Sequence, residues 1–156
     1  MMDQPKIDFA PLIPESGLHL HTLSSLKELA VLPFPESARR EALFNALAVY
    51  LELLESTGLM AFIWVDGSFM CAKPEPDDID LVVVYDAERV DSLSESALEV
   101  VNELLNTNRT KARFNLHVFR AASDDSEGLD FWFQKFGTQR DEVTPKGLAE
   151  LRINHD

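Results

Sequence analysis

Apolar side chains recur at helical spacing in the stretch that covers residues 35–58. One face of this stretch carries the apolar residues Leu43, Leu47, Tyr50 and Leu54. A spacing of three or four residues is typical of an amphipathic helix. Pro35 suits the first turn of such a helix, and Gly58 suits its end. The pattern therefore predicts a helix over residues 35–58.

Two short apolar runs predict buried strands. The first covers residues 59–65, is rich in aromatic and β-branched side chains and stops at Asp66-Gly67. The second covers residues 78–85 and is rich in valine. A polar loop with two prolines, residues 73–77, lies between them. The two halves of this region are therefore predicted to form neighbouring strands.

The second half of the chain alternates between helical and strand patterns. Residues 90–107 open with Ser92 and Glu95 at capping-box spacing, which predicts an amphipathic helix. Residues 112–119 alternate between apolar and polar side chains, which predicts a third strand. Its polar face would carry Arg113, Asn115 and His117. Residues 121–128 read as an acidic loop, 129–136 as an aromatic-rich helix and 137–147 as a polar segment before a short tail.

These elements predict one domain of the α/β (α+β) class over residues 1–156. A short mixed sheet would hold the three strands, and helices would pack mainly on one face. Residues 1–34 carry four prolines and read as an arm with one short helix over residues 22–31. The core would cover residues 35–120, and residues 121–156 would form a C-terminal extension.

Composition narrows the class of protein. The chain has 156 residues, with 14 Lys and Arg against 27 Asp and Glu, and a net charge of −13. This charge argues against duplex nucleic acid as a partner, because such binding depends on basic side chains that contact phosphates. The single cysteine, Cys71, excludes an intrachain disulfide framework. Without an apolar run near 18 residues, we expect a cytoplasmic protein that does not span a membrane.

The chemistry is concentrated in one stretch, where Gly67-Ser68 precedes the pair Asp78 and Asp80. Alternation along a strand places the two aspartates on one side, with Cβ atoms about 7 Å apart. Carboxylates are costly on a buried strand unless they are compensated, and Mg²⁺ or Mn²⁺ would compensate them. A glycine lets the backbone approach a phosphate closely, and Ser68 can donate to its oxygens. The alternative is a solvated strand end beside an ordinary turn.

This order of residues resembles the signature of the nucleotidyltransferase superfamily, which includes DNA polymerase beta and the minimal nucleotidyltransferases. The signature is a hydrophobic residue and Gly-Ser, followed after about ten residues by Asp-hydrophobic-Asp-hydrophobic. The chain is also similar to a family of small bacterial nucleotidyltransferase-like proteins of unknown function. The wider likeness rests on Pro14, Gly17, His19, Arg39-Arg40, residues 73–80, Phe136-Gly137, Arg140 and residues 145–147.

The resemblance implies that Asp78 and Asp80 hold Mg²⁺ (or Mn²⁺), while Gly67 and Ser68 grip a nucleoside triphosphate. It also implies a third carboxylate on a neighbouring strand. The predicted strand over residues 112–119 offers Asn115 there, which brings no negative charge, with His117 two residues on. Catalysis would then be weak, rerouted through His117 or Asp66, or absent.

Three basic residues remain as candidates for phosphate contacts: Lys73 in the loop, and Arg140 and Lys146 near the C-terminus. Each has a solvated surface role as its alternative.

Two functions are compatible with these residues. The first is a Mg²⁺-dependent transfer of a nucleoside monophosphate from a triphosphate to a hydroxyl of a protein, an RNA or a small molecule. The resemblance makes a toxin–antitoxin or phage-defence setting conceivable for it, with a protein partner or a homodimer that completes the site. The second is a catalytically degenerate fold that binds nucleotide or a partner protein.

Overall fold

The computed structural model describes residues 9–139 and 144–155. Its strands are β1 (Gly17–Leu20), β2 (Ala61–Asp66), β3 (Ile79–Tyr85), β4 (Leu116–Ala122) and β5 (Gly147–Ile153). Its helices are α1 (Leu23–Ala30), α2 (Ala38–Ser56), α3 (Ala87–Asp91), α4 (Glu95–Leu104), α5 (Thr107–Phe114) and α6 (Ser126–Phe136), with a single 3₁₀ turn, η1 (Ser68–Met70). No helix in the described ranges is long and apolar enough to cross a bilayer.

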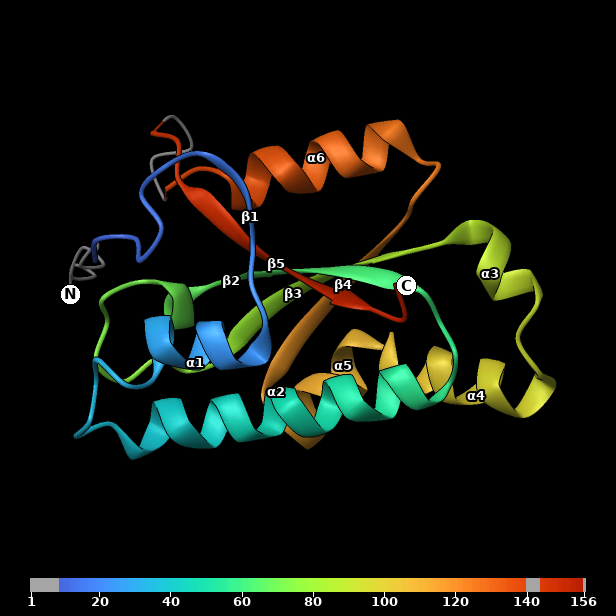
Figure 1. The fold of residues 1–156 in the computed structure, drawn as a ribbon, viewed down its shortest axis with the longest axis horizontal. Helices are drawn as coiled ribbons and strands as arrows, with labels where there is room; N and C mark the ends of the chain where they lie inside the picture. Colours follow the sequence, from blue (N-terminus) through green and yellow to red (C-terminus); the bar gives the residue numbers. More distant parts are fainter. Residues whose placement is uncertain (1–8, 140–143, 156) are drawn as a thin grey trace, which may run out of the picture.

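The strands form one five-stranded mixed sheet in the order β1-β5-β2-β3-β4 (Figure 1). The larger core joins one face of the sheet to α1, α2, α4 and α5, which lie below the sheet in the view of Figure 1. A smaller core joins the other face to α6, and its aromatic members include Trp64 and Phe136. The α/β (α+β) prediction, with helices mainly on one face, is confirmed.

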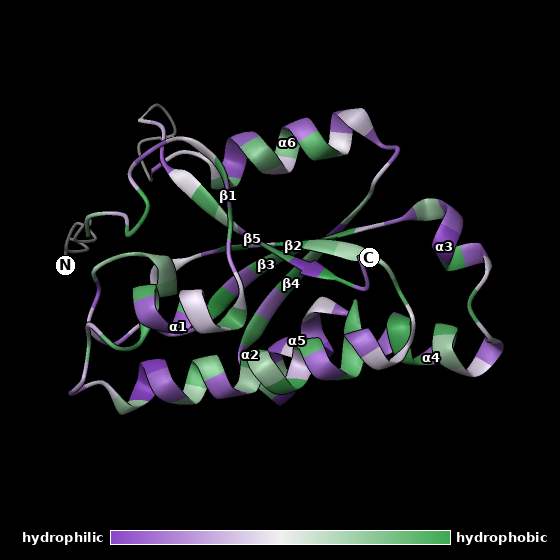
Figure 2. Ribbon diagram, viewed as in Figure 1, coloured by the Kyte–Doolittle hydropathy of each residue, from purple (hydrophilic) through white to green (hydrophobic). Residues whose placement is uncertain are grey.

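Helix α2 shows why the sequence pattern predicted its position well. Its apolar stripe is buried in the larger core, and Figure 2 shows hydrophilic and hydrophobic bands that alternate along its length. The Ser37 side chain caps the helix by accepting a hydrogen bond from the backbone N–H of Arg40. The helix therefore begins at Ala38 rather than at the first turn predicted from Pro35.

The strand predicted over residues 112–119 is wrong in its first half. Residues Thr107–Phe114 form α5, whose N-cap Asn106 accepts a hydrogen bond from the N–H of Arg109. Asn115 ends this helix in the left-handed conformation, at φ 56°, and β4 begins at Leu116. Thr110 and Phe114 are buried four residues apart, a spacing that fits a helix face as well as one side of a strand.

The helix predicted over residues 90–107 is also divided. Helix α3 precedes α4, and Ser94 rather than Ser92 caps α4. The segment that read as a polar stretch with a short tail contains β5, which lies between β1 and β2. Strand β5 is parallel to β1 and antiparallel to β2, so both ends of the chain contribute to the sheet.

Candidate functional site

Strand register brings three polar side chains together at one end of the sheet. Strands β2 and β3 are antiparallel with Asp66 opposite Asp80, and β3 and β4 are parallel with Asp80 opposite His117. Each of the three lies two residues along its strand from a member of the smaller core: Trp64, Val82 or Phe119. Side chains two residues apart share a face. Asp66, Asp80 and His117 therefore all project from the face that α6 covers.

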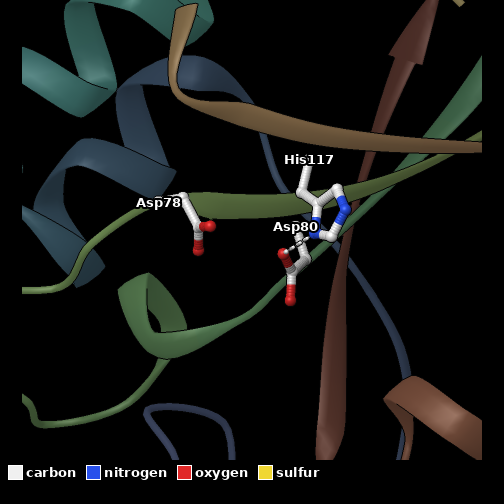
Figure 3. A group of neighbouring side chains, drawn as sticks. All are labelled: Asp78, Asp80 and His117. Atoms are coloured by element: carbon white, nitrogen blue, oxygen red, sulfur yellow. Dashed lines mark ion pairs between the residues drawn. The ribbon is translucent and has the colours of Figure 1, made fainter. Parts of the chain in front are cut away.

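Asp78, Asp80 and His117 form a group of possible metal ligands (Figure 3). Their ligand atoms lie within 4.8 Å of one another, and all three residues are half-buried. His117 Nδ1 is 3.6 Å from Asp80 Oδ1, and both aspartates direct their carboxylates to the same side of β3. We call Asp78, Asp80 and His117 the ligand triad. Its donors are two carboxylates and one imidazole, a set that suits a divalent cation.

The environment of Asp80 disfavours its charge. Burial and the neighbouring Asp78 carboxylate raise the pKa of Asp80, while His117 and Lys146 act in the opposite direction. Two carboxylates this close repel each other, and a cation between them relieves the repulsion. The donor types and the mutual repulsion both fit a metal ion.

The Gly67-Ser68 corner lies directly against the ligand triad. Gly67 has φ +91°, and a Cβ atom placed there would be 3.0 Å from the backbone nitrogen of Asp80 and 3.1 Å from its Cγ. A side chain at this position would therefore be strained and would push on Asp80. Ser68 begins the short turn η1, so the chain leaves β2 and turns away at the point where β3 carries Asp80.

A buried ion pair completes the polar end of the sheet. Lys146 Nζ is 2.6 Å from Asp66 Oδ1, and the two side chains are 10% and 9% exposed. Burial raises the pKa of Asp66 to about 6, although Lys146 acts to lower it. Lys146 was predicted as a candidate phosphate contact, and the structure places it instead in this pair beside Asp80. Only the position of β5, which the sequence pattern did not predict, brings residue 146 here.

The loop between the two halves of the motif is held by an arginine of α2. Arg40 is fully buried, and its guanidinium donates hydrogen bonds to the backbone carbonyls of Ala30, Phe69, Cys71 and Lys73. The guanidinium also stacks 3.8 Å from the centre of the Phe34 ring. Burial lowers the pKa of Arg40 to about 10. The sequence carries no local signal for this role, because three of the four acceptors are backbone atoms 29 to 33 residues further along the chain.

Arg39 holds the end of the same loop through hydrogen bonds to its backbone. Its side chain donates to the carbonyls of Pro76, at 3.0 Å, and Asp77. These contacts lie immediately before Asp78. Together Arg39 and Arg40 fix the segment that connects Ser68 to the first aspartate of the ligand triad.

The remaining predicted residues lie at different distances from the ligand triad. Lys73 forms an ion pair with the exposed Asp77, at 3.6 Å. Asn115 is outside β4, and its carbonyl accepts a hydrogen bond from the N–H of Ile79, at 3.3 Å. The residue opposite Asp80 is therefore His117 rather than Asn115. Arg140 lies outside the described residues.

A cavity of about 470 Å³ lies at the β4 edge of the sheet. Its lining includes Asn102, Thr107, Phe119, Arg120 and Trp132. The Phe119 ring that lines it packs 4.7 Å from the His117 ring, centre to centre, and stacks on Trp132. One aromatic side chain therefore separates the cavity from His117.

Comparison with known proteins identifies one family. No curated protein and no solved structure matches the chain. A family of unknown function, DUF6932, matches residues 5–152, which is nearly the whole chain and contains all members of the ligand triad. The chain therefore belongs to the DUF6932 family.

Proposed function

We propose that the protein is a divalent-metal-dependent nucleotidyltransferase that moves a nucleoside monophosphate from a triphosphate to a hydroxyl group. The observation that carries this proposal is the contact between the Gly67-Ser68 corner and Asp80, beside Asp78 and His117. A possible phosphate-binding turn and a possible metal site are thus in contact. The resemblance to nucleotidyltransferases supports the same assignment.

In this proposal Asp78 and Asp80 hold the cation and orient it toward the triphosphate. When bound, the cation neutralises charge on the leaving pyrophosphate and makes the acceptor hydroxyl more acidic. The acceptor oxygen forms a bond to the α-phosphorus, the bond from the α-phosphorus to the bridging oxygen breaks, and the hydroxyl proton passes to solvent. Gly67 leaves room for phosphate oxygens, and the Ser68 hydroxyl donates a hydrogen bond to one of them.

Lys73 supplies a mobile positive charge in the proposed complex. Its ion pair with Asp77 is long, at 3.6 Å, and Asp77 is 85% exposed. Exposed pairs of this kind contribute little to stability, so Lys73 can exchange Asp77 for a phosphate at small cost.

A cytoplasmic location, where nucleoside triphosphates and divalent cations are present, is part of the proposal.

The test measures nucleotide binding and transfer separately. Calorimetry with Mg²⁺ or Mn²⁺ and each triphosphate should show metal-dependent binding to the wild type, weakened at least about tenfold in Asp78→Asn and Asp80→Asn. Asp124→Asn is the control, because Asp124 is exposed and follows β4, outside the loop that carries Lys73. Release of pyrophosphate from an α-labelled triphosphate then reports transfer. Equal binding in all four proteins, or no binding, would refute the proposal.

A second candidate function is nucleotide binding without transfer. It is favoured by His117, which stands opposite Asp80 where the superfamily resemblance implies a third carboxylate. In that case the wild type binds triphosphate in the same metal-dependent way but releases no pyrophosphate with any hydroxyl acceptor. The protein would then act through a partner that recognises the nucleotide-bound form.

A further inference from the structure

The donor set of the ligand triad differs from the one that Mg²⁺ prefers. Mg²⁺ binds oxygen ligands almost exclusively and Mn²⁺ also suits carboxylates, whereas imidazole suits the later first-row metals, such as Fe, Ni, Cu and Zn. The third donor here is His117 Nδ1. A neutral imidazole in place of a carboxylate also removes one negative charge, which weakens the attraction for a hard cation.

We propose that His117 is a metal ligand and that it makes the ligand triad select a divalent transition metal, such as Co²⁺ or Zn²⁺, over Mg²⁺. This inference rests on the proposed function, because it assigns the metal of the same site. It differs from the expectation drawn from the resemblance, which gives Mg²⁺ (or Mn²⁺).

The geometry places the His117 ring ready to bind. Metal–ligand bonds of about 2.1 Å put neighbouring donor atoms about 3 to 3.5 Å apart. His117 Nδ1 and Asp80 Oδ1 are 3.6 Å apart, close to that spacing. The same nitrogen faces the carboxylate in Figure 3. A cation between them therefore needs only a small adjustment of either side chain.

The surroundings of His117 hold its ring in this orientation. Strand β4 is paired along its length with β3, which fixes the backbone of residue 117 opposite residue 80. The Phe119 ring packs against the imidazole at 4.7 Å, and Trp132 stacks on Phe119 from α6. Ligands whose orientation is fixed by their neighbours bind metal more tightly than mobile ones.

The contact between His117 and Asp80 does not by itself account for the cluster. The two side chains are 35% and 27% exposed, and 3.6 Å is long for a charge-assisted hydrogen bond. Such a pair is weak in water. It also does not involve the Asp78 carboxylate, whereas a cation among the three donors would compensate both carboxylates.

The experiment uses Mn²⁺, the weakest-binding ion of the first-row series, as a spectroscopic probe. It titrates the tag-free full chain with Mn²⁺ without nucleotide and follows the free ion by electron paramagnetic resonance. In the wild type, Mg²⁺ should displace bound Mn²⁺ only at about 100-fold molar excess or more, and pulsed measurements should show nitrogen-14 modulation from the imidazole. In His117→Asp, which restores an all-oxygen site, the required excess should fall at least about tenfold and the modulation should vanish.

Two further variants separate ligation from folding. His117→Gln should also lose the nitrogen modulation. His19 is a histidine on β1 that bonds the carbonyl of Glu15. The His19→Asn variant should therefore keep the nitrogen modulation and the wild-type metal selectivity. Circular dichroism establishes that each variant is folded. Bound Mn²⁺ without nitrogen modulation, equal displacement by Mg²⁺ in wild type and His117→Asp, or no Mn²⁺ binding would overturn the inference.

The outcome of this experiment can be told apart from a failure of the proposed function. Pyrophosphate release with Mg²⁺, together with Mn²⁺ that shows no nitrogen modulation, would leave the transferase proposal intact and remove the role of His117. Selective Mn²⁺ binding through His117, with no triphosphate binding, would do the reverse.

Discussion

Two buried basic residues flank the candidate site, and they are stabilised in different ways. Arg40 lies behind the loop that follows Ser68 and donates to backbone carbonyls from several parts of the chain. Lys146 lies beside the ligand triad and donates to one carboxylate, that of Asp66. A guanidinium has five N–H donors in a fixed plane, whereas an ammonium group is a compact charge. The arginine therefore fixes the shape of a loop, and the lysine neutralises charge beside Asp80.

Arg40 acts on the geometry of the site, and Lys146 acts on its electrostatics. The contacts of Arg40 determine where the loop between Gly67-Ser68 and Asp78 runs. The contacts of Lys146 affect the charge at the site, because Lys146 acts to lower the pKa values of both Asp66 and Asp80. The four predictions below test this division.

The largest effect is expected from Arg40→Met. The substitution leaves several buried carbonyls without donors, and each lost hydrogen bond to a charged group costs about 1.5 to 3 kcal/mol. We expect the free energy of unfolding to fall by about 5 kcal/mol, measured by urea denaturation. The free energy of unfolding of Arg40→Lys should lie between those of Arg40→Met and the wild type. Arg89→Lys is the control, because Arg89 is exposed where it bonds the Gly58 carbonyl; equal losses at the two positions would contradict the assigned role.

A smaller effect is expected when the ion pair is broken. Lys146→Met leaves Asp66 buried without its partner and should cost about 3 kcal/mol of unfolding free energy. Asp66→Asn in the same chain should recover part of this loss, since it removes the uncompensated charge. A double-mutant cycle by urea denaturation measures the coupling. Strictly additive losses would mean that the two groups do not interact.

The pH dependence of stability offers a third measurement. The carboxyl of Asp66 has a pKa of about 6 in the folded protein, against about 3.9 when unfolded. As pH rises from about 4 to 6, the unfolded chain releases this proton and the folded chain keeps it, so stability falls by up to about 3 kcal/mol. Urea denaturation across this range should show the fall in wild type relative to Asp66→Asn. An identical slope in both proteins would show that Asp66 titrates normally.

The smallest effect is expected from Arg39→Ala. Arg39 donates to the carbonyls of Pro76 and Asp77 near the surface, so water can replace it. The loss in unfolding free energy should be about 0.5 to 1 kcal/mol. Faster hydrogen exchange in residues 73–78, with little change elsewhere, would accompany it. A loss as large as that of Arg40→Met would show that both arginines hold the loop equally.

The local pattern of apolar and polar residues was sufficient to predict the positions of several helices and strands and of the glycine-serine and aspartate motif. Helix α2 and strands β2 and β3 were predicted to within about three residues, because their periodicity and their flanking proline and glycines agree. The motif order placed Gly67-Ser68 and the aspartate pair at the ends of consecutive strands. Antiparallel pairing then brings those ends together.

The third member of the ligand triad could not be predicted from the same pattern. Residues 112–119 alternate in a way that fits a strand, yet Asn106 caps a helix that continues to Phe114. This helix displaces Asn115 from the sheet and begins β4 at Leu116. Which residue stands opposite Asp80 is a question of register between β3 and β4, and register depends on packing across the sheet.

The amino-acid sequence alone determined the α/β (α+β) class, the acidic character of the chain and the pairing of a glycine-serine turn with two aspartates, since each depends on neighbours along the chain. Tertiary structure decided that His117 joins those aspartates, that Lys146 pairs with Asp66 and that Arg40 holds the loop. These contacts join residues 29 to 80 positions apart, and local periodicity carries no information about such distances.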